Sequence, residues 1–231
     1  ERSSSYATTL TNLAEAFKLK GDAGKAIELY RQVLSIDAET VGEDSPVYAI
    51  ALGNLAGALQ AQDGDPAQAA DLYQRALKIQ EATVGARAPD YATTLADLAL
   101  VREAQGELAE ACRLLEQAME VKASSVGVET QEYAALLNDL AVIVKKQGDI
   151  PRAVDLYRQA SVIDAATLGK DSEGYANTAY NLGRALEDLG SLEEALGKYE
   201  AAAAAELASG AGEPQASTAE AVSRVRASLG R

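Results

Sequence analysis

The feature that most constrains this chain is an internal repeat of about 42 residues. A Tyr-Ala dipeptide occurs five times, at spacings of 42, 43, 42 and 42 residues. The five copies begin at Tyr6, Tyr48, Tyr91, Tyr133 and Tyr175. A period in this range is typical of proteins that stack similar structural units, because each unit buries its apolar face only against its neighbours. The sequence therefore predicts a repeat array.

Two glycines follow each tyrosine in register and divide every unit into two segments. The first comes fifteen residues after the tyrosine, or sixteen in the second copy, and the second closes the unit. They are Gly21, Gly64, Gly106, Gly148 and Gly190, and then Gly42, Gly85, Gly127, Gly169 and Gly210, the last one place early. Glycines between periodic segments indicate tight turns. We predict two helices per unit, with a looser turn in copy two, where the extra residue lies within 60–63.

The first segment of each unit has the pattern of an amphipathic helix. A capping Ser or Thr precedes the tyrosine by three residues in four copies, whereas Ala88 breaks this pattern. Leucine pairs at i, i+3 spacing indicate a buried stripe, and the residue after the second leucine is always small, which predicts a close approach of the second helix. The caps are Ser3, Ser45, Thr130 and Ser172; the leucine pairs are Leu10/Leu13, Leu52/Leu55, Leu95/Leu98 and Leu137/Leu140.

These patterns predict an all-α fold, a solenoid of five helix-turn-helix units with a capping helix at the end. The units span about 3–44, 45–87, 88–129, 130–171 and 172–212, and the capping helix lies within 213–230, as Pro214–Leu229. We expect a single array over 1–231.

The recurring small and aromatic residues are similar to the signature of a known family. Copy two has Leu55-Ala56, Gly64, Ala69, Tyr73 and Ala76; copy five has Leu182-Gly183, Gly190, Ala195 and Tyr199. The pattern resembles the tetratricopeptide repeat (TPR) family, in the 42-residue variety found in kinesin light chains, over essentially the whole chain. The resemblance implies a right-handed superhelix, a concave wall lined by the first helix of each unit, and a role in binding other proteins.

The composition argues against most catalytic chemistry. There is no His, and the single Cys112 stands in an apolar column, where we expect a buried structural residue. No carboxylate lies in an apolar setting that suggests a raised pKa. We therefore predict no enzyme, no catalytic residues, no metal site and no cofactor.

The charge bears on partners and location. The chain has 21 basic and 35 acidic residues, a net charge of −14, which disfavours nucleic acid and anionic membrane surfaces. Its first residues do not read as a signal peptide, and we expect no membrane span, since no apolar stretch of about 18 residues occurs. We expect an intracellular and most simply cytoplasmic protein, excerpted from a longer chain; an organelle lumen or a cytoskeletal or ciliary complex stays open.

One polar column on the first helices stands out as a candidate binding site. Six residues after each tyrosine the chain has Asn12, Asn54, Asp97, Asp139 and Asn181. Asn and Asp are unfavourable inside helices, and the column nine residues after the tyrosine has diverged freely. An Asn amide donates and accepts together, so this ladder could hold the backbone of an extended peptide, about one rung per three residues. The resemblance implies the same role, because Asn residues in the groove of peptide-binding TPR proteins contact the peptide backbone. Alternatively, the side chains bond the preceding helix or loop.

Further polar residues surround the ladder. Thr8, Thr93, Asn138 and Asn177 lie near it, and Lys145 and Arg184 could accept an anion beside Asn138 and Asn181. Copies four and five are then the anion-accepting end, whereas copies one to three suit a neutral or basic segment. The alternative for Lys145 is a solvated helix face.

The leading functional hypothesis is a non-catalytic scaffold that binds an extended segment of a partner protein in the concave groove. A structural unit that docks by its ends or edges in a large complex is the first alternative. A scaffold or sensor arm of a larger multidomain enzyme is the second.

Overall fold

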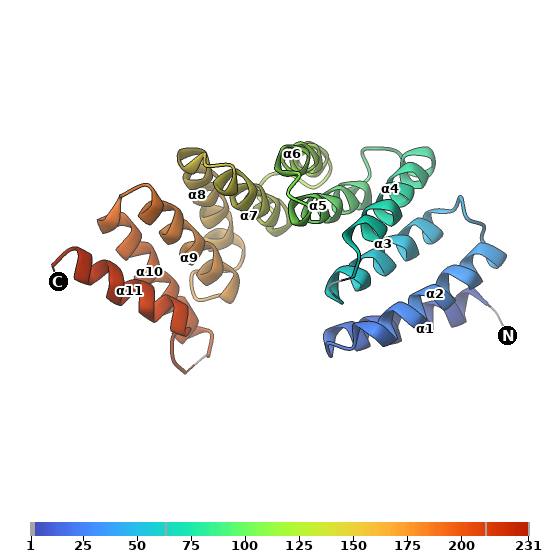
Figure 1. Cartoon of the computed structure of the whole chain (residues 1–231), viewed down its shortest axis with the longest axis horizontal. Coiled ribbons are helices and arrows are strands. Elements are labelled where there is room, and N and C mark those ends of the chain that lie inside the picture. Colours follow the sequence, from blue (N-terminus) through green and yellow to red (C-terminus); the bar gives the residue numbers. More distant parts are fainter. Residues whose placement is uncertain (1–2, 63, 211, 231) are drawn as a thin grey trace. The chain divides into compact units, whose positions relative to one another are not determined.

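The computed structural model describes residues 3–62, 64–210 and 212–230, and within them the chain forms eleven α-helices and no strand (Figure 1). The helices are α1 (Ser4–Leu19), α2 (Ala23–Thr40), α3 (Pro46–Ala61), α4 (Pro66–Thr83), α5 (Pro89–Ala104), α6 (Leu108–Ser125), α7 (Gln131–Lys146), α8 (Ile150–Thr167), α9 (Glu173–Asp188), α10 (Leu192–Ala208) and α11 (Ala216–Ser228). The prediction of an all-α fold built from helical pairs is confirmed.

The chain divides into two compact units, Glu1–Ser125 and Val126–Arg231. The first contains three helical pairs, α1/α2, α3/α4 and α5/α6; the second contains α7/α8, α9/α10 and the closing helix α11. Within each unit the second helix of a pair also packs against the first helix of the next pair. We refer to the first helix of a pair as helix A and to the second as helix B.

Helix starts follow the predicted caps. The side chains of Ser3, Ser45, Thr130 and Ser172 each accept a hydrogen bond from the backbone N–H of the tyrosine three residues on. Ala88 precedes α5 without a side-chain cap, as expected.

The inter-helix turns use glycine in the left-handed region, as at Gly21 with φ of 80°. The turn of copy two differs, because Gly64 is not among the glycines with positive φ and a Cβ there would lie 2.8 Å from the carbonyl oxygen of Leu59. This agrees with a turn altered by the inserted residue. The predicted loosening falls partly on residue 63, which lies outside the described residues.

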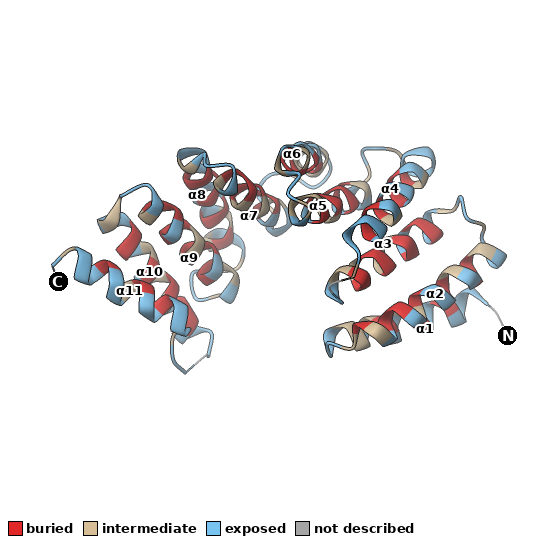
Figure 2. Cartoon of the chain, viewed as in Figure 1, coloured by how far each residue is buried: buried red, intermediate tan, exposed pale blue. Residues whose placement is uncertain are grey.

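Close helix packing through small residues is also confirmed. Ala14, Ala56, Ala99 and Ala141 are fully buried where the helices of a pair meet, and Figure 2 shows the buried residues on the helix faces that meet within each unit. In copy five the position is Gly183, where a Cβ would lie 2.8 Å from two ring carbons of the fully buried Tyr199. Cys112 is buried, as its apolar column predicts.

The expected burial of Leu13 is wrong. Its side chain is 45% exposed, whereas Leu98 at the same position of copy three is 3% exposed. In copies two, three and five the preceding helix B packs against helix A; among the described residues none covers that face of α1. Tyr6, on the same helix, is exposed for the same reason.

The last helix begins at Ala216 instead of Pro214. Its start is fixed by Glu206 of α10, whose carboxylate accepts hydrogen bonds from the backbone N–H of Gln215 at 2.9 Å and from the hydroxyl of Thr218 at 2.8 Å. Glu206 thereby caps α11 from the preceding helix. None of the helices described combines the length and apolar character that crossing a bilayer requires.

Candidate functional site

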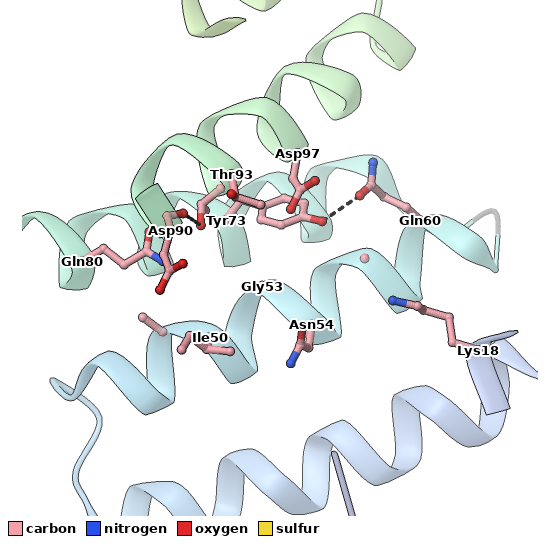
Figure 3. Close-up of a pocket in the computed structure, with 13 residues that line it drawn as sticks. Lys18, Ile50, Gly53, Asn54, Gln60, Tyr73, Gln80, Asp90, Thr93 and Asp97 are labelled. Carbon is pink, nitrogen blue, oxygen red and sulfur yellow. Dashed lines mark hydrogen bonds between the residues drawn. The ribbon is translucent and has the colours of Figure 1, made fainter. Parts of the chain in front are cut away.

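The polar column of the helix A segments lines pockets in both units. In the first unit, α3 and α5 flank a pocket of about 350 Å³ whose floor includes Tyr73 of α4. We call it the first groove. Its lining brings together three of the predicted residues, Asn54, Thr93 and Asp97, with Lys18 of α1 (Figure 3).

Two glycines of α3 leave this pocket open. Gly53 and Gly57 are one helical turn apart, and a Cβ on them would lie 3.9 Å from Cε1 and 3.4 Å from the hydroxyl oxygen of Tyr73. In copy one the position of Gly57 is taken by Glu15, whose carboxylate accepts a 2.9 Å hydrogen bond from the hydroxyl of Tyr30. The absence of such a side chain at Gly57 leaves space in front of Tyr73.

The hydroxyl of Tyr73 forms a hydrogen bond with another residue that lines the groove. It donates to Oε1 of Gln60 at 2.9 Å, which Figure 3 shows as a dashed line. Burial raises the pKa of Tyr73 well above its ordinary value, and the negative charge of Asp97 raises it further. Tyr73 therefore presents a neutral ring and hydroxyl to the groove at physiological pH.

Asp97 is the electrostatically unusual group of the first groove. Burial raises the pKa of this carboxyl to about 6, and the charge of Lys18 offsets only part of that effect. The expectation that no carboxylate lies in a setting that raises its pKa is wrong here. Within the described residues the carboxylate of Asp97 forms no hydrogen bond or ion pair, because Lys18 pairs with Glu15 at 2.8 Å.

A second polar column, which the sequence analysis missed, lies on the helix B segments. Seven residues after the buried aromatic residue of helix B come the buried side chains of Asp37, Gln80, Asp164 and Glu206. Burial raises the pKa of Asp37. Gln80 is 3% exposed, lines the first groove, and has a side-chain oxygen for which the described residues offer no hydrogen-bond partner. The repeat register could have revealed this column, since polar residues recur there beside apolar ones.

In the second unit, α7 and α9 flank a pocket of about 290 Å³, the second groove. Four predicted residues line it: Asn138, Asp139, Asn177 and Asn181. Asn138 is held in place, because its Nδ2 donates to Oγ1 of Thr178 at 2.8 Å, while its Oδ1 is buried and has no hydrogen-bond partner in the part of the chain that the structure describes.

The remaining predicted residues have more varied surroundings. Thr8 lines a pocket of about 290 Å³ between α1 and α3, together with Asn54 and the buried Asp37. The hydroxyls of Thr8 and Thr93 donate to the carbonyl oxygens of Ser4 at 3.0 Å and Pro89 at 3.2 Å.

Besides Thr8, three predicted residues lie outside both grooves. Lys145 forms an ion pair with Asp188 at 2.7 Å, and its side chain is largely buried. Asn12 and Arg184 are exposed. The structure thus brings the column together in neighbouring pairs, Asn54 with Asp97 and Asp139 with Asn181.

Known proteins share this architecture. The tetratricopeptide repeat profile matches residues 5–82, 57–124, 90–164 and 131–207. A Podosopora anserina protein of nearly identical TPR-like repeats, assigned to the kinesin light chains, superposes with a TM-score of 0.75 at 27% identity, covering 89% of this chain and 97% of that one. Among curated proteins, none matches the sequence.

Two further solved structures share the fold at lower identity. BtubC (BKLC) from P. vanneervenii has a TM-score of 0.71 at 21% identity and covers 90% of this chain and 82% of its own. MamA has a TM-score of 0.58 at 19% identity, with 84% and 94% covered. The matched profile spans nearly all of the described helices, and the chain belongs to the tetratricopeptide repeat family.

Proposed function

We propose that this chain is a non-catalytic interaction module that binds an extended segment of a partner protein along its helix A grooves. Tetratricopeptide repeats generally mediate protein–protein interactions. The observation that best supports binding in the grooves is that most side chains of the polar column on the helix A segments lack hydrogen-bond partners among the described residues. The side chains of four of its five members, Asn12, Asn54, Asp97 and Asn181, form no hydrogen bonds within the described part of the chain. This disfavours the alternative that the column bonds the preceding helix or loop.

The pockets provide space beside these groups. Asn54 and Asp97 belong to consecutive helix A segments and line one pocket, as do Asp139 and Asn181. Packed helices lie roughly 8–10 Å apart and an extended chain rises about 3.3 Å per residue, so consecutive rungs would meet every third peptide residue. Side-chain amides can bond both the N–H and the C=O of a peptide backbone without selecting its sequence.

A random peptide library displayed on phage tests this function. We expect enriched peptides that bind the wild-type chain and bind the Asn54→Ala and Asn181→Ala variants more weakly, by roughly tenfold for each lost bond pair. Glu28→Ala, an exposed position of α2, is the control and should bind normally. Enriched peptides that bind all variants equally would place binding elsewhere, and circular dichroism would confirm that helicity is unchanged.

A second candidate function is assembly through α1. Leu13 exposes apolar surface that the equivalent leucines of later copies bury, and Tyr6 is exposed where Tyr48 and Tyr175 are buried, so this helix could receive a helix of a second copy. Light scattering would show an oligomer that dissociates in the Leu13→Glu variant. A chain that stays monomeric at its highest soluble concentration would rule out such self-assembly.

A further inference from the structure

We propose that the first groove is a pocket for a basic side chain, in which Asp97 is the counter-ion of a lysine ammonium or arginine guanidinium on the bound partner segment. This inference rests on the proposed function and names the residue class that the groove selects. It follows from the shape of the pocket, from its charges and from the kind of hydrogen-bonding groups that it leaves free.

The shape suits a long side chain with an apolar stem. Gly53 and Gly57 contribute no side chain to the α3 wall, so the volume of about 350 Å³ extends to the ring of Tyr73. Figure 3 shows Asp97 beside this ring, and Ile50 also lines the pocket. The methylene stem of Lys or Arg can pack on such apolar surface while its charged end reaches the carboxylate. A cation near the tyrosine ring gains further attraction from the π system.

Among the charged groups that line the pocket, the carboxylate of Asp97 lacks a paired cation in the described part of the chain. Its charged lining residues are Lys18 from α1 and Asp90 and Asp97 from α5, and Tyr73 is the titratable group that α4 contributes. Lys18 already pairs with Glu15 at 2.8 Å, so it compensates the charge of Asp97 only in part. A carboxylate that is partly removed from water and unpaired raises the free energy of the folded chain, and a cation brought by the partner would lower it again. The raised pKa of Asp97 is the expected sign of that missing compensation.

The free hydrogen-bonding groups also favour donors on the partner. Gln80 is buried, lines the same pocket, and leaves its side-chain oxygen without a partner within the described residues. Asp90 lies two helical turns from Asp97, about 10 Å along α5, and offers a further acceptor. Lys and Arg side chains carry only donors, as do the backbone N–H groups next to them. The lining is therefore matched to a basic residue better than to an acidic one.

The same position in the second unit lacks this combination. In the second groove Asn181 of α9 takes the place that Asp97 of α5 has in the first, and the residue of α7 equivalent to Gly57 is Val142. The pocket for a basic side chain is therefore a property of the first groove.

Peptide pools with one fixed residue test the inference. The probes are acetylated and amidated octapeptides, randomised except for one central residue, which is Lys, Arg, norleucine or citrulline. Citrulline keeps the shape of arginine without its charge. We expect the wild-type chain to retain the Lys and Arg pools about tenfold better than the neutral pools, since a charge-assisted hydrogen bond contributes about 1.5–3 kcal/mol. Asp97→Asn should abolish this preference, while the exposed control Asp71→Asn on α4 keeps it.

The pH dependence gives a second readout. Because protonated Asp97 cannot act as counter-ion, the preference for the Arg pool should fall between about pH 7.5 and pH 5 in the wild type and be absent at both values in Asp97→Asn. Equal retention of all pools, or a preference that survives in Asp97→Asn, would overturn the inference and leave the proposed function standing. No retention of any pool would overturn both.

Discussion

The hydroxyl of Thr178 donates a 2.6 Å hydrogen bond to Oδ2 of Asp164, and Oγ1 of that hydroxyl accepts a hydrogen bond from Nδ2 of Asn138 at 2.8 Å. This buried chain links α8 to α9 and α9 to α7. Thr178 is 2% exposed and Asp164 is 5% exposed, so no water replaces these contacts cheaply. The polar column of helix B thus has a structural role in the second unit and positions a residue of the second groove.

Replacing Thr178 by Val should destabilise the chain by about 1–3 kcal/mol, because the variant keeps the shape but leaves Asp164 and Asn138 without their shared partner. The free energy of unfolding from urea denaturation measures this effect. Thr93→Val is the matched control: Thr93 is exposed and bonds only its own helix backbone, so its substitution should change stability by no more than about 0.5 kcal/mol. Equal effects at the two positions would contradict the role of the buried chain.

Asp97→Asn should stabilise the free protein at neutral pH. Burial raises the pKa of Asp97 from 3.8 to about 6, so the folded state binds more protons than the unfolded state between these values. The contribution of this group to stability therefore falls as the pH rises from about 4 to 6. We expect the variant to be more stable than the wild type by about 1–3 kcal/mol at pH 7.5 and equally stable near pH 4. A difference that does not change with pH would show that the carboxylate is already compensated; Asp71→Asn controls for the charge change.

Two glycine-to-alanine substitutions in the second unit should change the free energy of unfolding in opposite directions. Gly183→Ala places a Cβ within 2.8 Å of the Tyr199 ring, which is fully buried and held by a 2.8 Å hydrogen bond to Glu187, so we expect a loss of about 1–3 kcal/mol. Gly197 lies in α10 with nothing within 4 Å of an added Cβ, and Gly197→Ala should gain about 0.5–1 kcal/mol from helix propensity. Thermal unfolding followed by circular dichroism distinguishes the two, and a stabilising Gly183→Ala would mean that the ring shifts freely.

Leu13 and Leu98 occupy the same position of the repeat but should contribute differently to the free energy of unfolding. Leu98→Ala should cost about 2–5 kcal/mol because it leaves a cavity between helices, whereas Leu13→Ala should cost no more than about 1 kcal/mol, since its side chain is 45% exposed. Urea denaturation of both variants at low protein concentration provides the measurement. A large cost at Leu13 would show that a partner helix covers α1 in solution, as the second candidate function requires.

The sequence alone was sufficient for the fold because its signals are local and repeated. A Ser or Thr cap is recognised three residues from the N–H that it bonds, and glycine at a turn is required by one residue's own φ. Fivefold repetition then separates these signals from chance. The polar column from Asn12 to Asn181 could be found in the same way, although its role could not, since a helix-surface Asn has the same pattern whether it bonds its own chain or a partner.

Tertiary structure decided what depends on neighbours distant in sequence. Leu13 is exposed because no described helix lies on its side of α1, although its own sequence pattern equals that of Leu98. The pKa of Asp97 is set by burial among α3, α4 and α5 and by a lysine of α1 that is already paired. Such effects arise from desolvation and from which groups meet across helices, and neither quantity is encoded in the local spacing of residues. The repeat thus determined the helices and their order, while packing determined which of their polar groups are left to bind a partner.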